Sequence, residues 1–238
     1  MIKVVIGIQA RSTSQRFPRK VFEKIDGKEM LQHVLDAADE ACLYINKFTA
    51  KNDVKVSTCV LVPVGDEIVS RYRYKSVVFE GHEEDVLKRY KMMSDALDPD
   101  YIVRITSDCP LLPSYLISKS INVATKGNYD YVSNVDENIR TCVDGHDVEI
   151  MSRAALDWAD ECATFERDRE HVTPILRSNK IPTKFRVAHI VGHLYQPNIK
   201  LSVDTKEDLE RVKREYSEIK RCINQAFAKS GGKSVYRV

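Results

Sequence analysis

The residues best suited to do chemistry stand in one basic stretch near the start of the chain, Gln9-Ala10-Arg11-Ser12-Thr13-Ser14-Gln15-Arg16-Phe17-Pro18-Arg19-Lys20. It holds four cationic side chains and three hydroxyls. Arginine can bind phosphate oxygens bidentately, so the stretch is suited to grip a triphosphate. The alternative is an ordinary solvated basic loop. The stretch is neither a Walker A loop nor a G-x-G-x-x-G turn, which disfavours the P-loop and dinucleotide-binding classes.

Two aspartates each follow a short apolar run. Asp108 comes shortly after residues 101–105, and Asp204 comes directly after residues 201–203. If both runs are strands, their carboxyl ends lie at the edge where open α/β sheets bind ligands. Two carboxylates there suit Mg²⁺, which takes one or two carboxylates together with substrate phosphates and waters. The alternative is that Asp204 only caps the next helix and Asp108 only opens a turn.

A second set of polar residues lies in the later half of the chain. Asp147 and Glu149 are two residues apart, so a strand would place them on one face. There they could bind the hydroxyls of a substrate that accepts a transferred group, or they could act as further metal ligands. Arg169, Glu170 and His171 stand together near an expected helix start. Arg169 could bind an anionic acceptor, and His171 could orient a carboxylate or act as a base. The alternative is an exposed, charged helix end.

The elements that must position these residues follow from hydrophobic periodicity. Residues Ile2 to Ile8 are nearly all apolar and β-branched, as in a strand buried on both faces of a parallel sheet. The alternation of strands and helices implies right-handed crossovers, and it predicts an α/β fold, a three-layer α/β/α sandwich with a mostly parallel central sheet. In the first half we expect strands at 56–62, 76–79 and 101–105, and helices from 31 to 42, 86 to 97 and 112 to 124.

In the second half of the chain the hydrophobic periodicity is less regular, except near the C-terminus. Thr205 with Asp208 resembles a capping box, and an apolar stripe from Leu209 to Phe227 predicts a long final helix. We interpret residues 1–229 as one domain and residues 230–238 as a loose tail, because Ser230-Gly231-Gly232 should break the helix. Strands are expected at 129–133, 148–151, 183–190 and 201–203, and helices at 154–162 and 170–177.

Composition narrows the class of protein. The 238 residues carry a net charge of only +2, which does not indicate a nucleic-acid partner. No apolar run reaches a membrane-spanning length, so no membrane partner is expected. The six cysteines show no CxxC spacing, which favours reduced thiols in a cytoplasmic protein. A homodimer is compatible with the sequence but is not indicated by it.

Taken in order, the segments resemble the cytidylyltransferases of the spore-coat polysaccharide F type. The resemblance runs from residue 2 to about residue 212 and therefore covers most of the chain. CMP-Kdo and acylneuraminate synthetases are more distantly similar. The matching residues are Gln9-Ala10-Arg11, Ser14, Arg16, Pro18, Lys20, Gly81, Asp85-Val86-Leu87, Arg89-Tyr90, Arg104, Asp108-Cys109-Pro110-Leu111, Gly145, Asp147-Val148-Glu149, Arg169-Glu170-His171-Val172-Thr173, Val203-Asp204-Thr205 and Glu207-Asp208-Leu209.

This resemblance implies a nucleotide-diphospho-sugar transferase-like fold and transfer of a cytidylyl group from CTP, with Mg²⁺, in glycan precursor synthesis. The acceptor would be a small sugar, acidic sugar or phosphorylated molecule. Asp108 and Asp204 match metal-binding positions of related synthetases. The nucleotide-binding set that the resemblance implies is Gln9, Ala10, Arg11, Ser14, Arg16, Lys20 and Arg104.

The chain departs from the family pattern in the basic stretch. Thr13 and Arg19 stand where the family often has glycine. Thr13 would resist a positive φ angle, so the loop could take a different path. Arg19 would add charge beside the phosphates or point to solvent.

The sequence is also compatible with two other functions. A metal-dependent glycosyltransferase of similar fold usually needs Asp-x-Asp at the end of a strand, but the triplet Asp98-Pro99-Asp100 precedes a strand and suits a turn. A nucleotide-binding protein without catalysis is the second alternative. The presence of both aspartates and of the loop cations argues against it.

Overall fold

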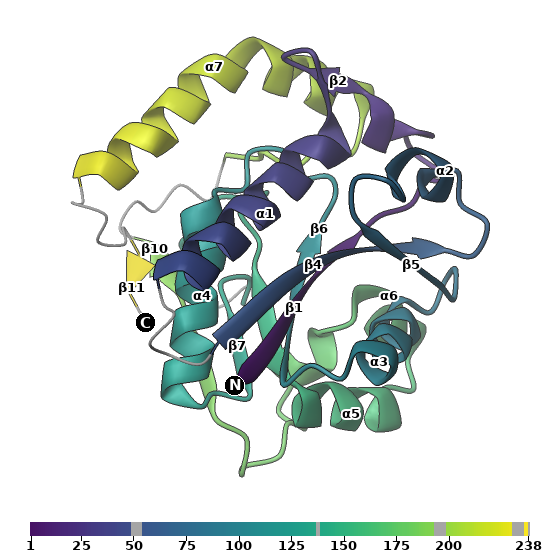
Figure 1. Ribbon diagram of the computed structural model, residues 1–238, viewed down its shortest axis with the longest axis vertical. Coiled ribbons are helices and arrows are strands. Elements are labelled where there is room, and N and C mark those ends of the chain that lie inside the picture. The colour runs from purple at the N-terminus through teal and green to yellow at the C-terminus, as the bar shows by residue number, and fades with distance from the viewer. Residues whose placement is uncertain (49–53, 137–138, 193–198, 230–235, 238) are drawn as a thin grey trace.

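A computed structural model describes residues 1–48, 54–136, 139–192, 199–229 and 236–237 (Figure 1). Its centre is a seven-stranded sheet with helices on both faces. In sheet order the strands are β5 (Val77–Gly81), β4 (Val54–Pro63), β1 (Ile2–Gln9), β6 (Tyr101–Thr106), β8 (Glu149–Ser152), β7 (Tyr131–Ser133) and β9 (Val187–His189). The helices are α1 (Met30–Phe48), α2 (Ile68–Tyr72), α3 (Val86–Leu97), α4 (Ser114–Gly127), α5 (Arg153–Cys162), α6 (Glu166–His171) and α7 (Lys206–Lys229).

The sheet is mostly parallel. Strand β8 runs antiparallel to both of its neighbours, β6 and β7, and the other pairings are parallel. Strand β1 is buried on both faces: Val4 and Ile6 join a core with α1 and α4, while Val5 joins a core with α3 and α5. This arrangement confirms the predicted α/β/α sandwich. It also places the carboxyl ends of β1, β4 and β6 side by side.

Three predicted elements differ from the structure. Residues 201–203 are not a strand, because only the isolated bridge between Asp144 and Lys200 pairs this segment. The predicted helix over 170–177 is split into α6 and the short 3₁₀ helix η3 (Pro174–Arg177), since Pro174 cannot donate the next helical hydrogen bond. The strand expected over 183–190 is confined to β9, because a turn with Phe185 N–H bonded to the Pro182 carbonyl at 2.9 Å precedes it.

Smaller elements complete the chain. A hairpin of β2 (Lys24–Ile25) and β3 (Lys28–Glu29) follows the 3₁₀ helix η1 (Lys20–Phe22). The tail expected over 230–238 lies mostly outside the described residues, but Tyr236–Arg237 form β11 and pair with β10 (Val191–Gly192). The capping box is confirmed, because Thr205 Oγ1 accepts from Asp208 N and Asp208 Oδ2 accepts from Thr205 N, both at 3.2 Å.

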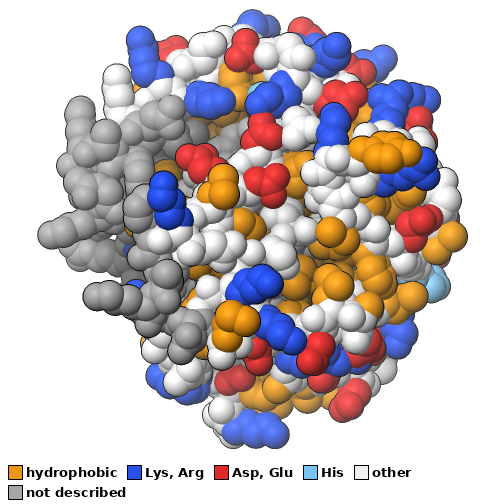
Figure 2. All heavy atoms as spheres, in the orientation of Figure 1, with side chains coloured by type: hydrophobic (Ala, Val, Ile, Leu, Met, Phe, Trp, Pro, Cys, Tyr) orange, Lys and Arg blue, Asp and Glu red, His pale blue; other side chains and the backbone are white. Residues whose placement is uncertain are grey.

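The surface and the cysteines agree with the composition. Figure 2 shows cationic and anionic side chains interspersed over the described part of one face. All six cysteines are free thiols. In the part of the chain that the structure describes, no helix combines the length and the apolar character that a bilayer crossing requires.

Helix α3 is fastened to the strand that leads into the basic loop. The hydroxyl of buried Tyr90 donates to the Gly7 carbonyl at 2.9 Å. A Cβ at Gly7 would lie only 2.6 Å from the Tyr90 ring, so this close approach requires glycine. The contact fixes the end of β1 against α3.

Replacing Tyr90 by Phe should lower the free energy of unfolding by about 1–2 kcal/mol, because the buried Gly7 carbonyl loses its donor. Denaturant unfolding measures this change. Tyr74→Phe is the control, since Tyr74 is 81% exposed and its replacement should leave stability nearly unchanged. Equal stability of the Tyr90→Phe variant and the wild type would contradict the assignment.

Candidate active site

The basic loop leaves β1 and closes on itself. Ala10 N–H extends the pairing with β4 through the Leu61 carbonyl at 3.0 Å, and Arg19 N–H donates to the Ser12 carbonyl at 2.8 Å. The buried carboxylate of Asp66 accepts from Ser12 N–H at 2.8 Å and from Ile68 N–H at 2.9 Å. The turn between β4 and α2 therefore holds the loop from outside.

Arg19 occupies the position where the family often has glycine, and its backbone explains that preference. It has a φ of 60°, in the left-handed region that glycine adopts without strain. Its guanidinium pairs with Glu67 at 3.0 Å and is 58% exposed. Thr13 is not among the described residues with positive φ. The loop thus keeps a glycine-like bend at Arg19 and needs none at Thr13.

Three cations of the loop differ in their surroundings. The Lys20 side chain is only 10% exposed, and its ammonium donates to Asp108 Oδ2 at 2.9 Å, Asp204 Oδ1 at 3.2 Å and the Val203 carbonyl at 2.8 Å. Arg16 is 69% exposed and reaches Asp204 Oδ1 at 2.9 Å. Arg11 is 45% exposed and lies 3.8 Å from the Glu170 carboxylate.

Asp108 and Asp204 are brought together by a backbone contact. Val203 N–H donates to the Asp108 carbonyl at 2.9 Å, which joins the end of β6 to the segment before α7. Gly145 makes room for that segment: its φ is 99°, and a Cβ there would lie 2.6 Å from the Ser202 nitrogen. The two predicted carboxylates consequently share one edge of the sheet with Lys20.

The electrostatics of this cluster favour a charged Asp204. Lys200 contacts Asp204 Oδ2 at 3.0 Å, opposite the oxygen that Lys20 and Arg16 contact. Burial acts to raise the pKa of Asp204, but the hydrogen bond from Lys200 and the charge of Lys20 outweigh it and lower the pKa. Asp204 is therefore a carboxylate at neutral pH.

The donor set fits a hard divalent cation that is completed by other ligands. Asp108 and Asp204 supply carboxylate oxygens, which Mg²⁺ prefers, and both reach one shared point, the Lys20 ammonium. Across the described ranges no group of three His, Cys, Asp or Glu side chains could hold a metal by itself. A cation here would rely on two protein carboxylates together with water or phosphate oxygens.

A buried ion pair lies farther along the same sheet. Arg104 contacts Glu149 Oε2 at 2.6 Å, and the Tyr131 hydroxyl donates to Glu149 Oε1 at 2.5 Å. Burial acts to raise the pKa of Glu149, but the Arg104 charge outweighs it and lowers the pKa. Among the described residues, Arg104 Nε and Gln9 Oε1 are buried without hydrogen-bond partners. These two atoms keep unused hydrogen-bonding capacity.

Asp147 forms an ion pair with Arg140 at 2.5 Å. Burial nevertheless raises the pKa of Asp147 to about 6. Asp147 precedes β8, whose first residue is Glu149, so only one of the two residues lies within the strand.

The three residues from 169 to 171 differ in how they are placed. Arg169 bridges Asp85 Oδ2 at 2.6 Å and Asp160 Oδ1 at 2.7 Å, and it thereby joins α6 to α3 and α5. Its guanidinium is occupied by structural contacts. Glu170 faces Arg11, whereas the His171 side chain is exposed. The structure brings Glu170 into the loop region and commits Arg169 to helix packing.

The sequence pattern does not indicate several residues of the site. Asp66 and Glu67 shape the basic loop, Lys200 completes the charge cluster, and Tyr131 and Arg140 hold Glu149 and Asp147. The sequence pattern could have indicated Asp66 as a site residue, because Asp66 follows the apolar run of β4 as Asp108 follows the apolar run of β6. The sequence offers no comparable signal for Lys200.

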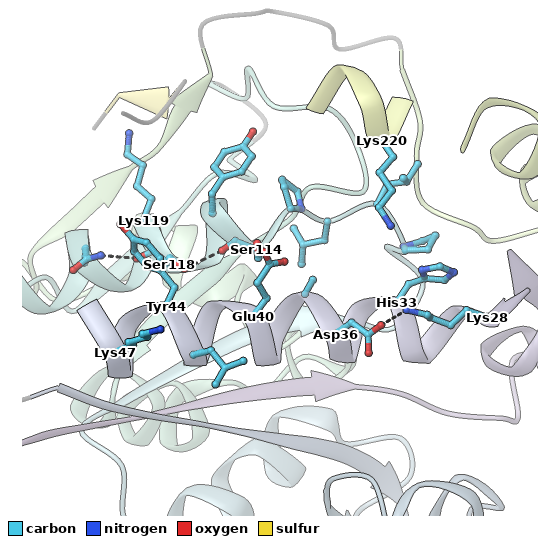
Figure 3. A pocket seen from close by; sticks show the side chains of 18 of the residues that line it. Lys28, His33, Asp36, Glu40, Tyr44, Lys47, Ser114, Ser118, Lys119 and Lys220 are labelled. Atoms are coloured by element: carbon cyan, nitrogen blue, oxygen red, sulfur yellow. Dashed lines mark hydrogen bonds and ion pairs between the residues drawn. The ribbon is translucent and has the colours of Figure 1, made fainter. Parts of the chain in front are cut away.

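A cavity of about 810 Å³ lies away from these residues, between α1, α4 and α7 (Figure 3). Lys28 and Asp36 form an ion pair at one end, near His33 and Lys220. None of the predicted site residues lines this cavity. The candidate site is thus defined by the charged cluster at the sheet edge rather than by the cavity.

The mostly parallel α/β/α sandwich, with a cationic loop and paired carboxylates at its carboxyl edge, has the arrangement expected of a nucleotidyltransferase. The chain belongs to the cytidylyltransferase family, whose sequence profile matches residues 4–231. This membership confirms the resemblance described above.

Two relatives are similar over most of their length. An uncharacterized protein of Methanocaldococcus jannaschii is 32% identical over 212 residues, which cover 88% of this chain and 81% of that protein. The spore coat polysaccharide biosynthesis protein SpsF of Bacillus subtilis is 26% identical over 226 residues, covering 92% and 88%.

Solved structures agree with the fold. A cytidylyltransferase from Leptospira borgpetersenii superposes with a TM-score of 0.77 at 25% identity, covering 98% of this chain and 96% of that one. CMP:2-keto-3-deoxy-manno-octonic acid synthetase complexed with CTP gives a TM-score of 0.64 at 15% identity, covering 91% and 99%. The second likeness shows a shared fold.

Replacing Asp66 by Ala should free the Ser12 amide, because its buried acceptor is lost. Hydrogen exchange at Ser12 should become roughly 10- to 100-fold faster, the range expected for a lost hydrogen bond to a charged group. Glu67→Ala is the control, since its pair with Arg19 lies at the surface and should contribute little. Unchanged protection of Ser12 in Asp66→Ala would show that Asp66 does not hold the loop.

Asp147→Asn should gain stability relative to the wild type as pH rises. Because the pKa of folded Asp147 is about 6 against an ordinary 3.8, its favourable contribution is full below the ordinary value and is lost as pH rises through about 6. Between about pH 3.5 and pH 7.5 the difference in free energy of unfolding should shift by roughly 2–3 kcal/mol in favour of the variant. Chemical denaturation across this range measures the shift, and a constant difference would contradict a raised pKa.

Proposed function

We propose that the chain transfers a cytidylyl group from CTP to a small sugar, acidic sugar or phosphorylated acceptor and releases pyrophosphate. The reaction would depend on Mg²⁺ and would supply a precursor for glycan synthesis, in the cytoplasm. The observation that supports this proposal best is the cluster in which Lys20 contacts both Asp108 and Asp204 beside the basic loop. The names of the relatives support the cytidylyl donor and the glycan setting.

The basic loop would bind the triphosphate. Arg11 and Arg16 are exposed enough to reach a ligand, and Lys20 stands behind them at the carboxylates. In phosphoryl-type transfer the protein mainly positions the groups and neutralises charge. The three cations would therefore stabilise charge that develops on the α-phosphate and on the departing pyrophosphate. Gln9, Ala10 and Ser14 would line the same loop around the nucleotide.

Asp108 and Asp204 would hold the metal. When bound, Mg²⁺ would supply positive charge against the phosphate oxygens. Asp66 would keep the loop backbone in place beside the two carboxylates, through its contact with Ser12. The acceptor oxygen would attack the α-phosphorus in line, and pyrophosphate would leave.

The acceptor would lie over the later strands. Glu149 lies there in an ion pair with Arg104, which belongs with Gln9 to the proposed nucleotide-binding set; among the described residues Gln9 Oε1 and Arg104 Nε are buried without hydrogen-bond partners. Asp147, Glu170 and His171 would bind acceptor hydroxyls or carboxylates from the rim. Arg169 would act on the acceptor site only indirectly, by holding α6 against α3 and α5.

The glycosyltransferase alternative loses support from the fold. Asp98 caps the end of α3, and Asp100 accepts a hydrogen bond from Lys3 N–H at 2.7 Å, before the start of β6. These two aspartates therefore lie at the amino ends of β1 and β6, while Asp108 follows the carboxyl end of β6. The triplet Asp98-Pro99-Asp100 is not placed to bind a nucleotide at the proposed site.

Asp108→Asn and Asp204→Asn should each lower pyrophosphate release from CTP roughly 100-fold or more, since each variant loses a charged metal ligand at constant size. Asp98→Asn is the matched control: Asp98 is exposed at the opposite edge of the sheet and its replacement should leave the rate unchanged. Wild-type rates in both site variants at saturating Mg²⁺ would refute the metal assignment.

The same assay tests the donor and the reaction. The four nucleoside triphosphates are each combined with sugars, acidic sugars and phosphorylated acceptors, and product mass is read together with pyrophosphate. We expect pyrophosphate with CTP and an acceptor that gains a cytidylyl group. Release of a nucleoside diphosphate from a nucleotide-sugar would indicate glycosyl transfer, and binding of CTP without turnover across the panel would indicate an inactive protein.

A further inference from the structure

The Lys20 ammonium has the surroundings of a bound cation. It has three N–H donors, and three oxygens surround it: Asp108 Oδ2 at 2.9 Å, the Val203 carbonyl at 2.8 Å and Asp204 Oδ1 at 3.2 Å. The side chain is 10% exposed, so water has little access to it. Every donor of Lys20 is used, and each of the two carboxylates that suit a metal contributes an oxygen.

The negative charge of the two aspartates is already compensated without a metal. Asp204 contacts Arg16 through one oxygen and Lys200 through the other, in addition to Lys20. A divalent cation placed between Asp108 and Asp204 would meet the Lys20 ammonium at close range, and like charges repel strongly where water is excluded. The free protein therefore offers such a cation little attraction.

The protein also lacks ligands to complete a metal shell. Within the described ranges no third His, Cys, Asp or Glu joins Asp108 and Asp204. Mg²⁺ and Mn²⁺ need oxygens beyond two carboxylates, and a triphosphate carries them. A triphosphate also offers a new anionic partner to a displaced lysine.

Resting on the proposed function, we infer that Lys20 occupies the cation position between Asp108 and Asp204 until a nucleotide arrives. The divalent cation then enters together with the triphosphate, and Lys20 moves from the carboxylates to the phosphates. Lys20 thus couples metal binding to nucleotide binding. A site of this kind does not take up free divalent cations when the nucleotide is absent.

The test is a titration of the nucleotide-free protein with Mn²⁺ alone, in which electron paramagnetic resonance measures free Mn²⁺. Lys20→Met should bind Mn²⁺ roughly 10- to 100-fold more tightly than the wild type, because the competing charge is gone. The same variant should bind CTP with Mn²⁺ more weakly than the wild type, because the phosphates lose a cation. A lysine with a purely structural role would not produce these opposite changes.

Two further variants sharpen the comparison. Lys213→Met is the matched control, since Lys213 pairs with Glu210 on α7 rather than with Asp108 or Asp204; it should leave Mn²⁺ affinity unchanged. Adding Asp204→Asn to Lys20→Met should abolish the gain. Mn²⁺ binding by the nucleotide-free wild type as tight as that of Lys20→Met would overturn the inference.

The wild type provides a measurement that does not depend on the folding of any variant. Crystals soaked with Mn²⁺ alone should show no anomalous peak between Asp108 and Asp204, and crystals soaked with Mn²⁺ and CTP should show one, with Lys20 displaced. A peak without nucleotide would overturn the inference. If the wild type bound no nucleotide with any cation, the proposed function would fail, and the nucleotide-free titration would still decide the role of Lys20.

Discussion

The contact of one lysine with two aspartates organises the carboxyl edge of this sheet. Lys20 belongs to the segment after β1, Asp108 follows β6, and Asp204 precedes α7, so a single ammonium joins three distant parts of the chain. The nearly buried position of Lys20 excludes most water and strengthens these charge-assisted hydrogen bonds. Two half-buried carboxylates side by side would repel each other without nearby cations. Lys20, together with Arg16 and Lys200, therefore offsets the charge of the two aspartates in the free protein.

Backbone hydrogen bonds from neighbouring residues hold Lys20 and the two aspartates in place. Asp66 holds the Ser12 amide, and the left-handed turn at Arg19 returns the chain so that Lys20 points at the aspartates. On the other side, the Asp108 carbonyl accepts from Val203 N–H, and Gly145 leaves space for that segment. The reactive side chains stand on loops, but each loop is fixed by a hydrogen bond from a neighbouring element.

How much of the fold and of the site the sequence predicts depends on how far apart in the sequence the interacting residues are. The doubly buried strand at Ile2–Gln9 and its parallel partners were predictable, because continuous apolar runs report local burial. The meeting of Asp108 and Asp204 was also predicted, although residues 201–203 are joined to Asp108 by a backbone hydrogen bond rather than by a strand ladder. Arg169 was not predictable in the same way, since its partner Asp85 lies 84 residues away and no local pattern reveals that contact.

The commitment of Arg169 to packing removes one cation from the proposed acceptor site. Arg169 is engaged by Asp85 and Asp160, which leaves Arg11 and the Arg104–Glu149 pair as the other charged groups to consider. Arg11 itself faces Glu170, at the long distance of 3.8 Å, so only a weak contact restrains it. A weakly held arginine can turn to an incoming anion at little cost, whereas the buried Arg104–Glu149 pair keeps its shape. The chain thus combines a rigid buried ion pair with an exposed arginine that is only weakly restrained.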